Sequence, residues 1–170
     1  KTDRGTINLN TNGSFPQRVE RLCEAGLDSI RVTLNSPHPK YYRRYHQPRR
    51  YTLEKVIDSL ILAKEKGLYT SINLLVLPGF TDREKEVEGW VELVRNTHLD
   101  LIQMRNLNID PDFYLNEMGR GEGMGISRMI EVLKTEVSSL QFGYFNRTKE
   151  HFRSQIANRT CLPVGRDCKI

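Results

Sequence analysis

Residues 71–79 read SINLLVLPG, and this stretch decides the fold class. Apart from Ser71 and Asn73 it is apolar up to Leu77, and Pro78-Gly79 closes it. A nearly continuous apolar run of this length is typical of a strand buried on both faces, as in a parallel sheet. The stretch therefore predicts a parallel strand, and parallel neighbours need long crossover connections, which are usually helices.

Both flanks of this strand predict such helices. On the N-terminal side, apolar residues recur at helical spacing from Leu53 to Leu60, with Thr52 as the candidate N-cap and Gly67 at the end. On the C-terminal side, the segment 81–84 has the T-x-x-E spacing of a capping box, and apolar residues follow at 87, 90, 91 and 94.

The same alternation continues outward in both directions. Apolar/polar alternation predicts strands over residues 7–12, 29–35 and 101–107 and a weaker one over 140–145, and helices are predicted over 16–26 and from residue 126 to 133. Alternating strands and helices favour an α/β fold of parallel βαβ units, either a doubly wound sheet or part of a TIM-type (β/α) barrel. No G-x-G-x-x-G follows the first strand, which weighs against a dinucleotide-binding fold. We expect the core over residues 1–145 and a tail without clear periodicity over 146–170.

Composition limits the class of protein. The chain has 170 residues, 26 Lys+Arg and 21 Asp+Glu, and a net charge of +5, which suits one domain. No apolar run is long enough for a membrane helix and no secretion signal is visible, so no membrane partner is expected. Three cysteines are too few for a disulfide-built fold, so a reducing, cytoplasmic location is predicted. Because the first residue is Lys, the chain is interpreted as a piece of a longer protein.

Polar residues collect where the predicted strands end. The segments are 11–13, 35–37, 78–82 and 106–111, and further polar side chains lie inside the strands, namely Asn8, Asn10, Thr33, Asn73 and Arg105. In barrels and open α/β sheets the ligand binds at the carboxyl ends of the strands, where the next helices also offer free N–H groups. These segments therefore predict a ligand site.

Four of these stretches together resemble the radical S-adenosylmethionine (radical SAM) superfamily. They read NLNTNG, SIRVTLNS, SINLLVLPGFTDREKE and LIQMRNLNIDP, in that order, and the resemblance covers about residues 5–112, from the third strand of the family barrel onward. It implies a partial (β/α) TIM-type barrel with parallel strands and an enzyme that binds S-adenosylmethionine and a [4Fe–4S] cluster. In that family the reduced cluster cleaves the cofactor to a 5′-deoxyadenosyl radical, which abstracts hydrogen from a substrate.

The resemblance also implies cofactor-binding residues, which we take over position by position. They are Thr11 and Asn12 near the cofactor or substrate; Thr33, Asn35 and Ser36 toward the ribose or methionyl carboxylate; Asn73; Leu77 and Pro78 near the adenine; and Asn106, Leu107 and Asn108 after the sixth strand. Arg105 is interpreted as a carboxylate-binding residue, because a guanidinium pairs bidentately. No catalytic residue and no metal ligand is assigned in this chain, and the substrate is not predicted.

The sequence departs from the family at the cluster. The C-x3-C-x2-C loop and the Gly-Gly-Glu-like motif of the family are absent, so the cluster ligands are expected to lie before Lys1. Cys23 is interpreted as a small core residue. Cys161 and Cys168, spaced C-x6-C, could join a metal site only with ligands from elsewhere.

Two alternatives from other classes stay open. A non-iron (β/α) barrel lyase or isomerase could use Asp82, Asp110 or His38 as acid/base groups. A nucleic-acid-binding module could use the basic and aromatic loop over residues 38–51, because such grooves combine charge for phosphates with rings for bases, although we favour this less. The strand 7–12 is expected to be an exposed edge, which would permit a homodimer.

Overall fold

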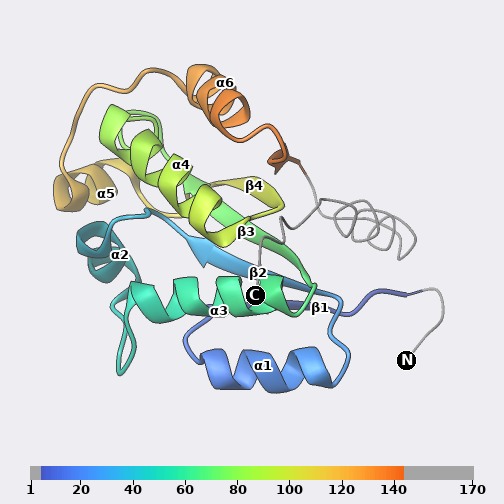
Figure 1. The fold of residues 1–170 in the computed structure, drawn as a ribbon. Coiled ribbons are helices and arrows are strands. Elements are labelled where there is room, and N and C mark those ends of the chain that lie inside the picture. Colours follow the sequence, from blue (N-terminus) through green and yellow to red (C-terminus); the bar gives the residue numbers. More distant parts are fainter. Residues whose placement is uncertain (1–4, 144–170) are drawn as a thin grey trace, which may run out of the picture.

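The computed structural model describes residues 5–143 and places them in a parallel five-stranded sheet with helices packed on one face (Figure 1). The spatial order of the strands follows the sequence, β1-β2-β3-β4-β5, and every pair is parallel. The strands are β1 (Asn8–Thr11), β2 (Ser29–Leu34), β3 (Tyr69–Val76), β4 (Leu101–Asn106) and β5 (Gln141–Phe142). Sequential order with helical crossovers is that of a (β/α) barrel segment, so the predicted fold class is confirmed.

Helices connect the strands, and four of them form a layer over the sheet. The helices are α1 (Pro16–Glu24), α2 (Pro39–His46), α3 (Leu53–Glu65), α4 (Glu84–Thr97), α5 (Pro111–Met118) and α6 (Ile126–Glu136). Helices α1, α3, α4 and α6 make the layer, whereas α2 and α5 lie at the carboxyl ends of the strands (Figure 1). Within residues 5–143, no helix combines the length and the apolarity that crossing a membrane requires.

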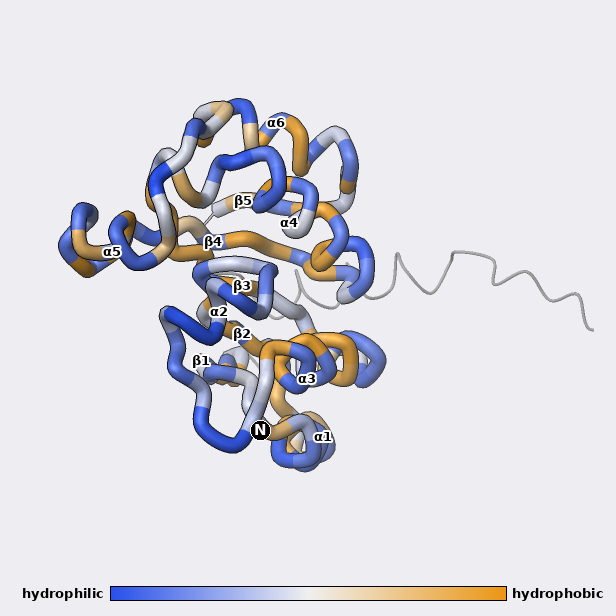
Figure 2. Tube along the Cα trace, turned by 90° about the vertical axis from the view of Figure 1, so that its left-hand side faces the viewer, coloured by the Kyte–Doolittle hydropathy of each residue, from blue (hydrophilic) through white to orange (hydrophobic). Residues whose placement is uncertain are grey.

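The core lies between the sheet and this helical layer. Ile30, Val32 and Leu34 of β2 alternate into it and are fully buried, as the sequence predicts. Trp90 of α4 and Leu60 of α3 are fully buried in the same cluster. Figure 2 shows the corresponding apolar colouring along β4 and on α3. This packing holds the strands in place from the helix side, so the opposite face of the sheet can carry polar side chains.

The basic and aromatic segment over residues 38–51 is expected to be a loop, but most of it forms helix α2. Pro39 occupies the first helical turn, where its missing N–H costs no hydrogen bond. Tyr42 is fully buried, and Gln47 ends the helix in the left-handed region at φ 43°. The segment lacks the aliphatic periodicity that predicts a helix, because the side chains that it buries are aromatic.

Two further local predictions are corrected. The capping box over residues 81–84 does not form: α4 begins at Glu84, and the buried Thr81 hydroxyl instead accepts a 2.9 Å hydrogen bond from the Leu77 N–H. No helix is predicted between residues 107 and 126, yet the Asp110-Pro111-Asp112 stretch begins helix α5, where Asp110 is the N-cap and accepts a 2.8 Å hydrogen bond from the Phe113 N–H. The predicted tail, residues 146–170, lies outside the described residues.

Candidate functional site

The inner face of the sheet, opposite the helical layer, carries a row of polar side chains. Thr33 of β2, Asn73 of β3 and Gln103 of β4 are register partners in neighbouring strands. Their chain neighbours Val32 and Ile72 belong to the core on the other side of the sheet, so alternation turns these three toward the inner face. The row crosses the middle of the sheet near its carboxyl edge.

A cavity of about 420 Å³ opens at this row. Polar residues from three strands and the segment after β4 line it together with two apolar ones; they are Thr33, Asn73, Leu75, Met104, Arg105, Asn106 and Asn108. No carboxylate is among these residues, and Arg105 supplies the one formal charge. The lining therefore suits a ligand that carries an anionic group together with hydrogen-bonding groups.

Two buried amide oxygens of the inner row lack hydrogen-bond partners among residues 5–143. They are Asn73 Oδ1 and Gln103 Oε1. An unsatisfied buried acceptor costs about 1–3 kcal/mol, and a bound donor would remove that cost. Since Asn73 lines the cavity, its Oδ1 fits a ligand with N–H or O–H groups, such as the amine, ribose hydroxyls or adenine amine of S-adenosylmethionine.

The inner face is also positively charged. Arg31 lies on β2 and Arg105 on β4, both on the side of the sheet that faces away from the helical layer. Burial lowers the pKa of Arg31 from its ordinary value, and the positive charge of Arg105 lowers this pKa further. Two guanidinium groups on one face of the sheet favour anionic ligands there.

Five of the twelve predicted site residues thus meet at the cavity, namely Thr33, Asn73, Arg105, Asn106 and Asn108. The structure adds Leu75 and Met104 to the lining and Gln103 to the inner row, none of which the sequence reasoning selected. Strand alternation could have found Gln103, because it is two residues from Arg105 and therefore shares its face. No sequence signal marked the two apolar residues as different from core residues.

Thr11 and Asn12 do not line the cavity. The Thr11 hydroxyl accepts a 3.1 Å hydrogen bond from the Gly13 N–H, and Asn12 Oδ1 accepts one of 3.2 Å from the Ser14 N–H. Gly13 adopts φ 66°, which favours glycine. Both side chains therefore stabilise the tight turn that leads from β1 into α1.

Asn35 and Ser36 are fully buried at the end of β2 and bind other elements. Asn35 Nδ2 donates hydrogen bonds of 3.0 Å to the Tyr114 hydroxyl and 3.3 Å to the Tyr41 backbone oxygen. The Ser36 hydroxyl donates a 2.8 Å hydrogen bond to Glu86 Oε2. These two residues join β2 to α2, α4 and α5 instead of lining the cavity.

Leu77 and Leu107 pack against an aromatic cluster built around Phe80 and Tyr114, while Pro78 is exposed. Tyr41 of α2 meets Phe80 edge-on at 5.1 Å between ring centroids, and Tyr45 meets Tyr114 at 5.7 Å. Burial raises the pKa of Tyr114 to about 12, so its hydroxyl stays neutral. The tyrosine rings of α2 pack against other residues of the chain, so they do not present the exposed faces on which the bases of a nucleic acid would stack.

The acid/base groups of the lyase alternative have structural partners. Asp82 is buried, and its carboxylate accepts hydrogen bonds from the N–H groups of Gly79, at 2.7 Å, and Gly125, at 2.9 Å. Asp110 caps α5, and His38 Nε2 lies 3.0 Å from the Lys85 backbone oxygen. None of the three lines the cavity.

The described residues of this chain, 5–143, do not fit an iron–sulfur cluster. Between residues 5 and 143, no group of three or more His, Cys, Asp or Glu side chains is placed to hold a metal. Cys23 of α1 is partly buried against the core, and burial raises the pKa of its thiol, which disfavours the thiolate that a cluster needs. Cys161 and Cys168 lie outside the described residues.

A parallel sheet with its cavity at the carboxyl ends of the strands defines a ligand-binding α/β barrel segment. The radical SAM superfamily matches residues 1–91, more than half of the chain, and the chain belongs to that superfamily. The resemblance seen in the sequence is therefore confirmed.

Three relatives are similar to part of this chain. A probable GTP 3′,8-cyclase of Methanosarcina mazei is 35% identical over 112 residues, which is 62% of this chain and 32% of that protein. The GTP 3′,8-cyclase of Aquifex aeolicus is 37% identical over 79 residues, 46% of this chain and 24% of that protein. The FeMo cofactor biosynthesis protein NifB of Rhizobium meliloti is 29% identical over 107 residues, 52% of this chain and 22% of that protein. The chain thus spans about a third or less of the length of these relatives.

Solved structures agree on the fold. A radical SAM methyltransferase from Sphaerobacter thermophilus superposes with a TM-score of 0.62 at 18% identity, over 83% of this chain and 41% of that one. HydG, a maturase of the [FeFe]-hydrogenase, superposes with a TM-score of 0.61 at 15% identity, over 89% of this chain and 35% of that one. At these identities the likeness establishes the barrel segment alone.

Proposed function

We propose that this chain forms the S-adenosylmethionine-binding part of a radical SAM enzyme, with the cavity between β2, β3 and β4 as the cofactor site. The observation that carries the proposal is the unsatisfied Oδ1 of Asn73, which lines a cavity that also contains Arg105. A buried acceptor beside a cation matches a ligand that has both donors and a carboxylate, and the methionyl group of the cofactor has both.

Five of the seven lining residues have a role in this proposal. Arg105 pairs with the methionyl carboxylate, because a guanidinium presents two parallel N–H donors. Thr33 and Asn73 bind the amine or the ribose hydroxyls, and Leu75 and Met104 shield the reacting end from water. When bound beside a reduced [4Fe–4S] cluster held elsewhere in the enzyme, which donates one electron, S-adenosylmethionine would supply the 5′-deoxyadenosyl radical that abstracts hydrogen from the substrate. The protein residues orient the cofactor and exclude solvent.

The cluster is assigned to other parts of the enzyme. The three cysteines of this chain lack the C-x3-C-x2-C spacing, and the relatives are about three times as long as the matched region or more. We therefore propose that the cluster ligands come from residues outside these 170. The similar proteins include both GTP 3′,8-cyclases and an FeMo cofactor biosynthesis protein, two different activities, so the role proposed for this chain is binding of the cofactor.

The proposal is tested by titrating S-adenosylmethionine into the 170-residue chain by calorimetry, with S-adenosylhomocysteine and methionine as comparison ligands. We expect saturable binding that Arg105→Lys weakens about tenfold, since the ammonium loses the second parallel hydrogen bond. Arg128→Lys is the matched control, because Arg128 is exposed on α6 and pairs with Glu131. Absence of binding, or equal weakening by both variants, overturns the proposal.

A further inference from the structure

A second hollow lies on the far side of the molecule from the cavity, between helices α4 and α6. Its volume is about 540 Å³. Residues from both helices and the segment before α6 line it; they are Glu84, Val87, Glu88, Val91, Glu92, Arg95, Asn96, Met124, Val132 and Glu136. We call this hollow the α4/α6 groove. It takes no part in the cofactor site.

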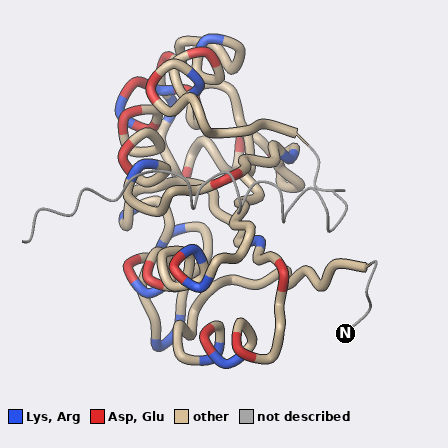
Figure 3. Tube along the Cα trace, turned by 45° about the vertical axis from the view of Figure 1, so that its right-hand side comes forward, with Lys and Arg blue, Asp and Glu red and all other residues tan. Residues whose placement is uncertain are grey.

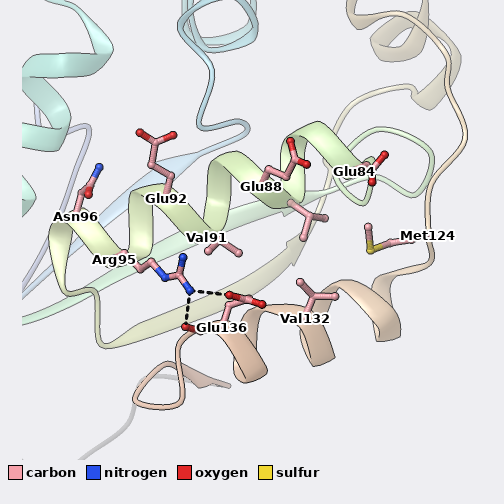
Figure 4. Close-up of a pocket in the computed structure, with 10 residues that line it drawn as sticks. Glu84, Glu88, Val91, Glu92, Arg95, Asn96, Met124, Val132 and Glu136 are labelled. Carbon is pink, nitrogen blue, oxygen red and sulfur yellow. Dashed lines mark hydrogen bonds and ion pairs between the residues drawn. The ribbon is translucent and has the colours of Figure 1, made fainter.

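The floor of the α4/α6 groove is apolar. Val91 of α4 and Val132 of α6 point toward one another across it, and Met124 lies at one end (Figure 4). The Met124 side chain is 37% exposed, which makes it one of the few large hydrophobic side chains on the surface of the described chain. An exposed apolar strip between two helices is the kind of surface that a third helix covers.

The α4 rim of the groove is acidic. Glu84, Glu88 and Glu92 are exposed and follow one another at intervals of four residues, so they lie on one side of α4 (Figure 4). Elsewhere acidic and basic residues are interspersed along the helices (Figure 3). Within the described residues, these three carboxylates have no hydrogen-bond or ion-pair partner. Like charges at this spacing repel by a few tenths of a kcal/mol, and the whole chain is basic with a net charge of +5. The row is thus an acidic patch on a basic chain, and no residue among 5–143 pairs with its carboxylates.

The two ends of the groove differ. At the end near the C-terminus of α4, Arg95 Nη2 donates hydrogen bonds to the Glu136 carboxylate, at 2.6 Å, and to the Glu136 backbone oxygen, at 3.2 Å (Figure 4). This pair neutralises Glu136 and ties α6 to α4. The opposite end holds Glu84 and Met124, and no described residue ties the two helices together there by an ion pair. The acidic rim from Glu84 to Glu92 is about 12 Å long, which is a little over two helical turns.

We propose that the α4/α6 groove docks a basic amphipathic helix of a partner protein. Its leucine-type side chains would cover Val91, Val132 and Met124, and its lysines or arginines would pair with Glu84, Glu88 and Glu92. Apolar anchors at helical spacing set the fit of such helix-in-groove contacts, and complementary charge speeds association and selects the partner.

The probe is a synthetic 14-residue peptide, KLLKKLLKKLLKKL, labelled for fluorescence anisotropy and titrated with the 170-residue chain. A scrambled peptide of the same composition serves as the first control, because it keeps the charge and loses the apolar face. We expect binding of the amphipathic peptide at least tenfold tighter than that of the scrambled one, and weakening as salt rises from 50 to 500 mM.

Variants of the chain locate the binding surface. Glu88→Lys with Glu92→Lys should weaken binding at least tenfold, whereas the control pair Glu65→Lys with Glu131→Lys makes the same change in net charge at exposed positions outside the groove and should not. Met124→Ser tests the apolar floor at an exposed side chain, so folding is retained, and it should weaken binding several-fold. Equal effects of the two charge pairs, no effect of Met124→Ser, or equal binding of the scrambled peptide would overturn the proposal.

Discussion

The hydroxyl of Ser36 donates a 2.8 Å hydrogen bond to the carboxylate of Glu86, and this bond joins the end of β2 to the first turn of α4. The same hydroxyl accepts a 3.1 Å hydrogen bond from the His38 N–H, while His38 Nε2 lies 3.8 Å from Glu86 Oε1. Glu86 is only 1% exposed. A carboxylate is therefore buried at the junction of three elements, where its ionisation affects the stability of the fold.

Glu86 makes the stability of the chain depend on pH. Burial raises its pKa above the ordinary 4.5, more than Ser36, His38 and Arg83 lower it. The folded state thus binds this proton more tightly than the unfolded state, and the contribution of Glu86 to the free energy of unfolding decreases as pH rises above 4.5. In Glu86→Gln this loss is absent, so the variant should gain stability relative to the natural chain as pH rises above 4.5.

Urea unfolding at several pH values checks the Glu86 prediction. Glu88→Gln is the matched control, because Glu88 is an exposed carboxylate on the same helix, and it should follow the profile of the natural chain. A stability difference between Glu86→Gln and the natural chain that grows as pH falls would contradict the argument.

His46 produces a pH effect of opposite sign. Its ring stacks on Tyr42 at 4.4 Å between centroids, and burial lowers its pKa from 6.5 to about 4. Between these values the unfolded state binds a proton that the folded state does not, so the free energy of unfolding falls as pH drops from 6.5 toward 4, by a few kcal/mol at most. His46→Gln should flatten this part of the profile.

The His46 prediction is read from the slope of stability against pH, since loss of the ring stacking lowers the stability of the variant at every pH. His98→Asn is the control: His98 is exposed at the end of α4 with φ 49°, a conformation that asparagine tolerates. A profile for His46→Gln as steep as that of the natural chain would show that His46 is not the titrating group.

Gly123 lies where a side chain cannot fit. A Cβ at this position would overlap the Asp82 carboxylate, which accepts the N–H groups of Gly79 and Gly125. We expect Gly123→Ala to lower the free energy of unfolding by about 1–3 kcal/mol, because one of these hydrogen bonds must lengthen or break. Thermal unfolding measures the change. The neighbouring exposed residue provides Glu122→Ala as a control, and a loss as large in that variant would locate the effect in the loop as a whole.

The strands and most helices could be predicted because their signals are local. Val32, Ile72 and Ile102 lie on the helix side of the sheet as alternation requires, and Gly26 and Gly67 end helices with positive φ. Helix α2 was missed because its buried face is aromatic and polar, with Tyr42 as its only fully buried side chain. Helical periodicity in aliphatic residues is absent there.

Four of the five predicted residues that line the cavity lie within strands, and the fifth, Asn108, follows β4. Thr33 and Asn73 lie within strands, so alternation fixes their face. Asn35 and Ser36 follow the last residue of β2, where alternation no longer applies, and their partners Tyr114 and Glu86 are 79 and 50 residues away in sequence. Such long-range pairing depends on how α4 and α5 pack, which no local pattern specifies.

Asn12 and Asn73 distinguish the residues of the turn from those of the cavity. Asn73→Ala should weaken S-adenosylmethionine binding about tenfold at little cost in stability, because it removes an acceptor that is unsatisfied without ligand. Asn12→Ala should leave binding unchanged and lower the free energy of unfolding by about 0.5–1.5 kcal/mol, because the Ser14 N–H loses its acceptor. Calorimetric titration and urea unfolding of both variants give the two readouts. Weakened binding in Asn12→Ala together with normal binding in Asn73→Ala would move the cofactor site to the end of β1.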